Sequence, residues 1–168
     1  GIPFFSEDGT GGAEEEEEEL VGYRTVSPAP GLRFVVLDTY DIAVHDRPPS
    51  SRKAREARSV LSKNNPNYPH AENSPEGLTG AQRRFVAFNG GVGSTQLRWL
   101  RDTLSHAKER EEKVIVFSHQ PLMPGSSNSV CLVWNYEEVL GVLRTFAGTV
   151  VASFAGHAHK GGYTRDES

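Results

Sequence analysis

Cysteine is almost absent from this sequence, and long apolar runs are absent altogether. Cys131 is the single cysteine among 168 residues, so no disulfide can form within the chain and a disulfide-stabilised secreted scaffold is excluded. A lone cysteine also fits a reducing compartment, and we expect the protein to be cytoplasmic. The sequence contains no apolar stretch long enough to cross a membrane and no recognisable signal peptide at its start, so we expect no membrane partner.

Strong net charge is also missing outside one short segment. The formal charge is −4, and removing the six consecutive glutamates Glu14–Glu19 would leave +2. Because the rest of the chain is close to electrically neutral, it offers no electrostatic basis for binding nucleic acid, and we expect no such partner. We interpret the glutamate run as an acidic low-complexity insertion rather than a cation site, because like charges repel one another and keep such a segment solvated.

Hydrophobic residues make up only 36% of the chain, alongside 17 glycines and 10 prolines, which predicts a modest core and long loops. We predict a poorly ordered lead-in over residues 1–31 and a partial domain over residues 32–168. Within that domain, apolar runs at 34–37 and 114–117 predict buried strands, the first of them buried on both faces, and the run at 149–154 predicts a last strand. Amphipathic or Arg-rich segments predict helices at 50–61, from Ser94 to 107, and from Asn135 to just before Gly148.

Strands that alternate with helices of this length predict an α/β layered fold. Two helix starts have specific signals in the sequence. Ser94 is a candidate N-cap, and Asn135 with Glu138 three residues later resembles a capping box. Residues 64–77 are rich in Asn and Pro and predict a loop. We expect Trp99 and Trp134 to pack in the core.

Three histidines follow two of the predicted strands. His119 comes just after the strand at 114–117, and His157 and His159 follow the strand at 149–154. Ligands bind at the carboxyl ends of strands in open α/β sheets, and alternate residues of an extended segment face the same side. Neutral imidazole is a good ligand for Zn, Mn, Fe or Ni. A single histidine at a strand end is more often structural, but this combination favours a metal site.

Two motifs around these histidines carry a family resemblance. Ser118-His119-Gln120-Pro121 and Gly156-His157-Ala158-His159 are similar to the last two motifs of calcineurin-like metallophosphoesterases. The resemblance narrows to the manganese-dependent ADP-ribose/CDP-alcohol diphosphatases and extends from about Ser27 to the C-terminus. It rests on further segments: Ser27-Pro28-Ala29-Pro30, Leu37-Asp38-Thr39-Tyr40-Asp41, Phe88-Asn89-Gly90-Gly91, Val130-Cys131-Leu132-Val133-Trp134-Asn135-Tyr136 and Gly161-Gly162-Tyr163.

The resemblance implies a metallophosphoesterase-type α/β sandwich with two divalent metal ions, Mn²⁺ first and Zn²⁺ or Fe as alternatives. His119 and His157 would bind one ion and His159 the other, with the order of the two ions left open. The nucleophile would be an oxygen species bridging the ions, so no side chain is needed in that role. The substrate would be a small nucleoside diphosphate-linked sugar or alcohol. Asn89, Gly90 and Cys131 would border its pocket.

The sequence also departs from the family pattern. The earlier family motifs, Asp-x-His, Gly-Asp-x-x-Asp and Gly-Asn-His-Asp/Glu, do not occur in it. We expect them upstream of Gly1, so that the chain is incomplete at both ends and inactive by itself. Two alternatives stay open: a general metallophosphoesterase that acts on a monoester or diester, and a non-catalytic truncated remnant. We interpret Asp38 and Asp41, which also follow a strand, as structural residues.

Overall fold

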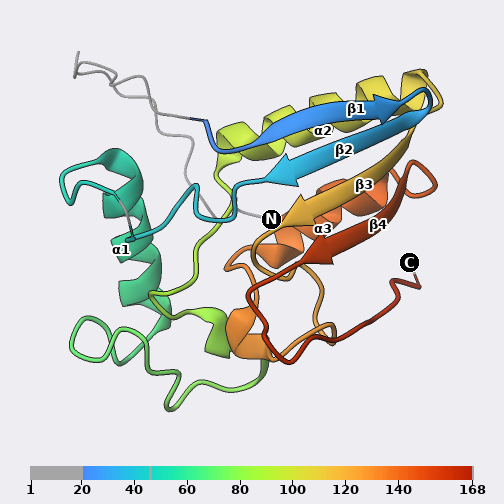
Figure 1. The fold of residues 1–168 in the computed structure, drawn as a ribbon. Helices are drawn as coiled ribbons and strands as arrows, with labels where there is room; N and C mark the ends of the chain where they lie inside the picture. Colours follow the sequence, from blue (N-terminus) through green and yellow to red (C-terminus); the bar gives the residue numbers. More distant parts are fainter. Residues whose placement is uncertain (1–20, 46, 168) are drawn as a thin grey trace.

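The apolar runs and amphipathic segments of the sequence form a sheet with helices packed against it, in a computed structural model that describes residues 21–45 and 47–167. Within these ranges the sheet has four strands, in the order β1-β2-β3-β4 (Figure 1). The elements are β1 (Arg24–Ala29), β2 (Leu32–Leu37), α1 (Arg52–Asn64), η1 (Gly80–Arg84), α2 (Ser94–Glu109), β3 (Lys113–Ser118), η2 (Ser129–Cys131), α3 (Tyr136–Thr145) and β4 (Val150–Ala155). The predicted α/β fold is confirmed, and so are its three strands and three helices. The expected burial is wrong in part, because β2 is buried on one face and half-buried on the other, and β4 is mostly exposed.

The three strands β2, β3 and β4 run parallel to one another. β2 pairs with β3 from Leu32↔Lys113 to Leu37↔Ser118, and β3 pairs with β4 up to Ser118↔Ala155. Parallel strands end at the same edge of a sheet. The residues that follow Leu37, Ser118 and Ala155 are therefore brought to one edge, as the sequence predicted.

Strand β1 was not predicted. It pairs antiparallel with β2, with Val26 opposite Phe34 and Ala29 opposite Leu32, so the predicted lead-in is wrong for residues 24–29; residues 1–20 lie outside the described part of the chain. The prolines that suggested a loop are compatible with this edge strand. The intervening Pro30-Gly31 pair forms its two-residue turn, in which Gly31 takes a φ of 73° that side chains disfavour.

One face of the sheet is covered by α2 and α3 (Figure 1). Alternate residues of the strands point into this core, which joins them to both helices. Its members include Val35, Leu37, Val114 and Val116 from the strands, Leu100 and Leu104 from α2, and Val139 and Leu143 from α3. Each fully buried side chain of this size contributes roughly 1.5–3 kcal/mol. Trp99 packs against the same core.

The opposite face of the sheet also carries large apolar side chains. The ring of Phe117 lies 5.2 Å from that of Phe34 and 5.8 Å from that of Phe154. Phe154 is 57% exposed and Val26 50%. Figure 1 shows both sheet-packing helices on the other side. The same strands therefore have one buried and one largely uncovered face within the described part of the chain.

Helix α1 packs away from the sheet, in a second apolar cluster. Ala57, Val60 and Leu61 of α1 meet Phe85 and Trp134 there, and Trp134 is fully buried as expected. The segment after α1, predicted as a loop, has no regular element before η1. Among the described residues, no helix combines the length and the apolar character that a membrane span requires.

Both predicted helix-start signals are corrected by the structure. The N-cap of α2 is Gly93, and Ser94 is the first helical residue. Asn135 is the N-cap of α3, but its side chain makes no capping bond. Its Oδ1 instead accepts from the Val92 N–H at 2.9 Å, and its Nδ2 donates to the Val92 carbonyl at 2.8 Å. The capping box does not form as predicted, because Oδ1 of Asn135 accepts from Val92 and its contact with Glu138 is a bond between side chains, from Nδ2 to Oε2 at 2.8 Å.

Candidate metal centre

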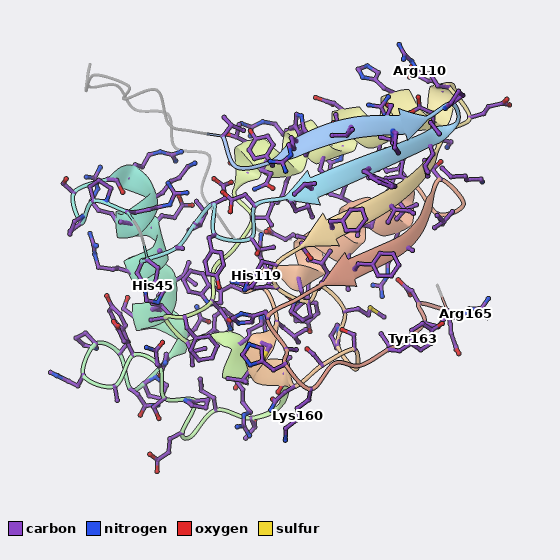
Figure 2. All side chains as sticks on the ribbon, viewed as in Figure 1. His45, Arg110, His119, Lys160, Tyr163 and Arg165 are labelled. Carbon is purple, nitrogen blue, oxygen red and sulfur yellow. The ribbon has the colours of Figure 1, made fainter. Side chains whose placement is uncertain are left out.

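His119 and His157 lie side by side at the carboxyl edge of the sheet. They follow the ends of β3 and β4, and the Gly156 N–H extends the pairing by donating to the His119 carbonyl at 3.0 Å. As a result, Nε2 of His119 lies 3.1 Å from Nδ1 of His157, with the ring centroids 4.9 Å apart. Figure 2 shows the side chain of His119 projecting beyond the end of β3.

The backbone at His157 has an unusual conformation. Its φ is 60°, in the left-handed region, which costs a non-glycine residue on the order of 1–3 kcal/mol. Glycine adopts such a φ without this cost, and Gly156 directly precedes the histidine, but φ is positive at His157 and not at Gly156. A Cβ added at Gly156 would be 3.7 Å from His119, an ordinary contact. The strained residue is therefore a predicted ligand itself.

The ring of His157 is held from its other side. Its Nε2 lies 3.0 Å from Oδ1 of Asn89, and the ring of Phe88 lies 5.7 Å away. Burial lowers the pKa of His157, and the nearby His119 and His159 lower it further because a second positive charge is unfavourable there. The imidazole is thereby favoured in its neutral form, which is the form that binds metals.

His159 is exposed and does not join the pair, although it lies near enough to lower the pKa of His157. In the described ranges, no group of three or more His, Cys, Asp or Glu side chains is arranged to hold an ion. Two nitrogens bound at right angles to one ion, each about 2.1 Å from it, would be about 3 Å apart. The 3.1 Å between Nε2 of His119 and Nδ1 of His157 is compatible with such a pair and also with a hydrogen bond between the two rings.

The carboxylates of Asp38 and Asp41, which follow β2, bond to groups of the protein other than the histidines. Oδ1 of Asp41 lies 2.6 Å from Nζ of Lys53, and its Oδ2 accepts from the Gly93 N–H and from Nε2 of Gln96. Asp38 accepts from the Tyr40 N–H, and burial raises its pKa. Both carboxylates thus have partners within the protein, which agrees with the interpretation of the two aspartates as structural residues.

A cavity of about 200 Å³ lies beside these aspartates. Its lining includes Tyr23, Asp38, Asp41, Lys53 and Glu56, but none of the three predicted histidine ligands. The cavity and the histidine pair are therefore separate features. We place the candidate site at the histidines, because their facing nitrogens are the groups suited to a ligand.

Two of the three predicted substrate residues are fully enclosed. Asn89 is 0% exposed, and its Nδ2 donates to the carbonyls of Arg84 and Val130. Gly90 donates its N–H to Oε1 of Gln120, and a Cβ added there would lie 2.5 Å from the Thr39 carbonyl. The polar groups of both residues are thus used within the protein.

Cys131, the third predicted substrate residue, is partly exposed in η2. Burial raises the pKa of its thiol, which favours the protonated form and agrees with the expectation that it is not a nucleophile. Of the three, it is the side chain that a ligand could reach in this structure.

Sequence reasoning did not single out the aromatic residues around the histidines or the contact from Asn89 to His157. The ring of Tyr40 lies 5.8 Å from that of His119, and its hydroxyl donates to the carbonyl of Phe88. These partners come from segments up to 79 positions apart in the numbering. The family-like segments at 37–41 and 88–91 were the available signal, but pairing them with the histidines required the fold.

Comparison with known proteins places these features in context. No family model matches the chain. A curated protein from Oryza sativa subsp. japonica is 48% identical over 144 residues, which is 86% of this chain and 44% of that protein. One from Homo sapiens is 42% identical over 149 residues, 89% of this chain and 42% of that protein. Both are named manganese-dependent ADP-ribose/CDP-alcohol diphosphatase.

The predicted family resemblance is confirmed. A crystal structure of a dimetal phosphatase from Danio rerio extends the match to the fold, with a TM-score of 0.84 and 39% identity. It covers 88% of this chain and 46% of that phosphatase. The metallophosphoesterase-type α/β fold is therefore confirmed, and the chain spans less than half the length of the diphosphatases that it matches.

Proposed function

We propose that this chain forms part of a metal-dependent hydrolase that cleaves the diphosphate bond of ADP-ribose, CDP-alcohols or similar nucleoside diphosphate-linked compounds. The observation that carries the proposal is the 3.1 Å approach of His119 Nε2 to His157 Nδ1 at the sheet edge. It occurs in a chain whose diphosphatase relatives have manganese dependence in their names. His119, His157 and His159 would be the nitrogen ligands of two divalent ions, Mn²⁺ first and Zn²⁺ or Fe as alternatives.

The roles of the chain's own residues follow from their surroundings. When bound, divalent ions polarise phosphoryl oxygens and offset the negative charge of a diphosphate. His157 contributes a neutral ring whose orientation is fixed by the contact with Asn89. Tyr40 and Phe88 flank the two histidines with their rings, and partly exposed Cys131 is the side chain that we place at the substrate.

A non-catalytic chain that binds a single ion is the second candidate. It is favoured by one observation: no described carboxylate joins the histidines in a group of three or more ligands. Imidazoles without carboxylates would give a weaker site with less charge compensation. The two candidates differ in turnover, so they can be separated by experiment.

The test uses the full-length protein that contains this chain, and measures Mn²⁺ binding by calorimetry and product release from ADP-ribose, CDP-choline and bis-p-nitrophenyl phosphate. Binding together with hydrolysis of the two nucleotide substrates supports the diphosphatase. Hydrolysis of the synthetic diester alone would indicate a general phosphoesterase, and binding without any turnover would indicate the second candidate. If neither His157→Ala nor His159→Ala changed Mn²⁺ binding, the proposed ligands would be wrong.

A further inference from the structure

Asn89 is buried beside the histidine pair, and its side chain has an unambiguous orientation. Its Nδ2 lies 2.8 Å from the Arg84 carbonyl and 2.6 Å from the Val130 carbonyl. Carbonyl oxygens only accept hydrogen bonds, so the amide atom between them has to be the NH₂ group. The oxygen of the amide therefore faces His157, at 3.0 Å from Nε2.

This orientation determines where the hydrogen of the neutral His157 ring lies. An amide oxygen can only accept, so the nitrogen that faces it carries the hydrogen. Nδ1, the other ring nitrogen, then has a free lone pair, and it is this atom that faces His119. We propose that Asn89 is a positioning residue that fixes the Nε2–H tautomer of His157 and presents Nδ1 to the candidate metal site.

Asn89 also connects this ring to the segment that carries Cys131. Val130, which accepts from Nδ2, directly precedes Cys131 in η2. One buried amide in the 88–91 loop thus connects the segment after β4 with η2. The same residue, His157, has the unfavourable φ of 60°.

The tautomer can be tested without any metal, whereas its effect on metal affinity rests on the proposed function. In the ¹⁵N-labelled, EDTA-treated chain at pH 8, nuclear magnetic resonance should detect hydrogen on Nε2 of His157, with slow exchange against solvent. Asn89→Leu removes the acceptor at similar volume, and we expect the protected Nε2–H signal to disappear and both tautomers to be populated. Asn89→Asp keeps an acceptor and should restore the Nε2–H form.

Asn73→Ala is a matched control. Asn73 is exposed and accepts from the Phe88 N–H, so its replacement disturbs the same loop without touching His157. This variant should retain the protected signal. Hydrogen on Nδ1 in the unsubstituted chain would overturn the proposal, and that measurement needs no variant to fold. A protected Nε2–H signal that persists in folded Asn89→Leu would overturn it as well.

Mn²⁺ titration separates this proposal from the proposed function. Residues that orient a histidine ligand affect metal affinity by about 10- to 100-fold, so Asn89→Leu should weaken Mn²⁺ binding by that factor and Asn73→Ala should not. If the unsubstituted chain bound no Mn²⁺ while His157 retained its Nε2–H tautomer, the proposed function would fail and the positioning role would stand. Unchanged Mn²⁺ affinity in Asn89→Leu would show that the tautomer of His157 does not affect metal binding.

Discussion

Two polar clusters lie at the carboxyl edge of the same sheet, and they differ in how completely their groups are bonded. The aspartate cluster, Asp38 and Asp41 with Lys53 and Gln96, follows β2. Both carboxylate oxygens of Asp41 have partners within the protein. The histidine cluster, His119 and His157 with Asn89, follows β3 and β4. Nε2 of His119 and Nδ1 of His157 face each other, and Nε2 of His157 contacts Asn89.

The difference distinguishes an internally bonded network from a candidate binding site. A buried carboxylate is stable only when hydrogen bonds and an opposite charge replace its water, and Asp41 is only 4% exposed. His119 is exposed, and the two rings contact uncharged side chains, those of Tyr40, Phe88 and Asn89. Sequence position alone does not distinguish the clusters, since acidic and imidazole residues alike follow buried strands.

The largest expected effect concerns the aspartate cluster. Asp41→Ala would leave the Gly93 N–H, the Gln96 amide and Lys53 without their shared acceptor. Breaking a buried charge pair costs about 3–5 kcal/mol, so we expect a loss of that size in the free energy of unfolding, measured by urea denaturation. His157→Ala should lower the free energy of unfolding by less. Equal losses in the two variants would show that the two clusters contribute equally to stability.

Metal affinity should show the opposite order. His157→Ala removes a proposed ligand nitrogen, and we expect Mn²⁺ binding by calorimetry to weaken by more than the roughly tenfold lower bound seen for second-layer changes. Asp41→Asn, which keeps an acceptor oxygen, should leave the affinity unchanged provided the variant is folded. His106→Ala, on the exposed side of α2, is the histidine control. A loss of Mn²⁺ in Asp41→Asn would place the aspartates in the site.

The sequence predicted the parts of this fold that periodicity controls. Continuous apolar runs marked β2, β3 and β4, and the histidines after two of them marked the candidate site. Strand β1 was missed because its residues are exposed at an edge and carry no apolar alternation. The contact between Asn89 and His157 spans 68 positions. No local pattern encodes it, because it depends on how the 88–91 loop meets the end of β4.

The smallest effect concerns Asp38, the partly open member of the aspartate cluster. Burial raises the pKa of its carboxyl, and the nearby Asp41 raises it further, against the bond from the Tyr40 N–H that lowers it. The carboxyl of Asp38 therefore has a higher pKa in the folded state than in the unfolded state. In that case the protonated carboxyl stabilises the fold at low pH, and this contribution to the free energy of unfolding is lost as pH rises through the folded-state pKa. Asp38→Asn keeps an acceptor for Tyr40 and has no such loss.

We therefore expect Asp38→Asn to match the unsubstituted chain near pH 3 and to become slightly more stable at pH 7, by on the order of 0.5 kcal/mol. Urea denaturation at the two pH values measures the change. Asn cannot ionise, so the gain has to grow with pH if desolvation of the charge is its cause. A variant that is less stable at pH 7 would show that the charge of Asp38 stabilises the aspartate cluster. Asp38 and Asp41 would then both stabilise the fold in their charged forms, and the two clusters would differ only in the properties of the histidines.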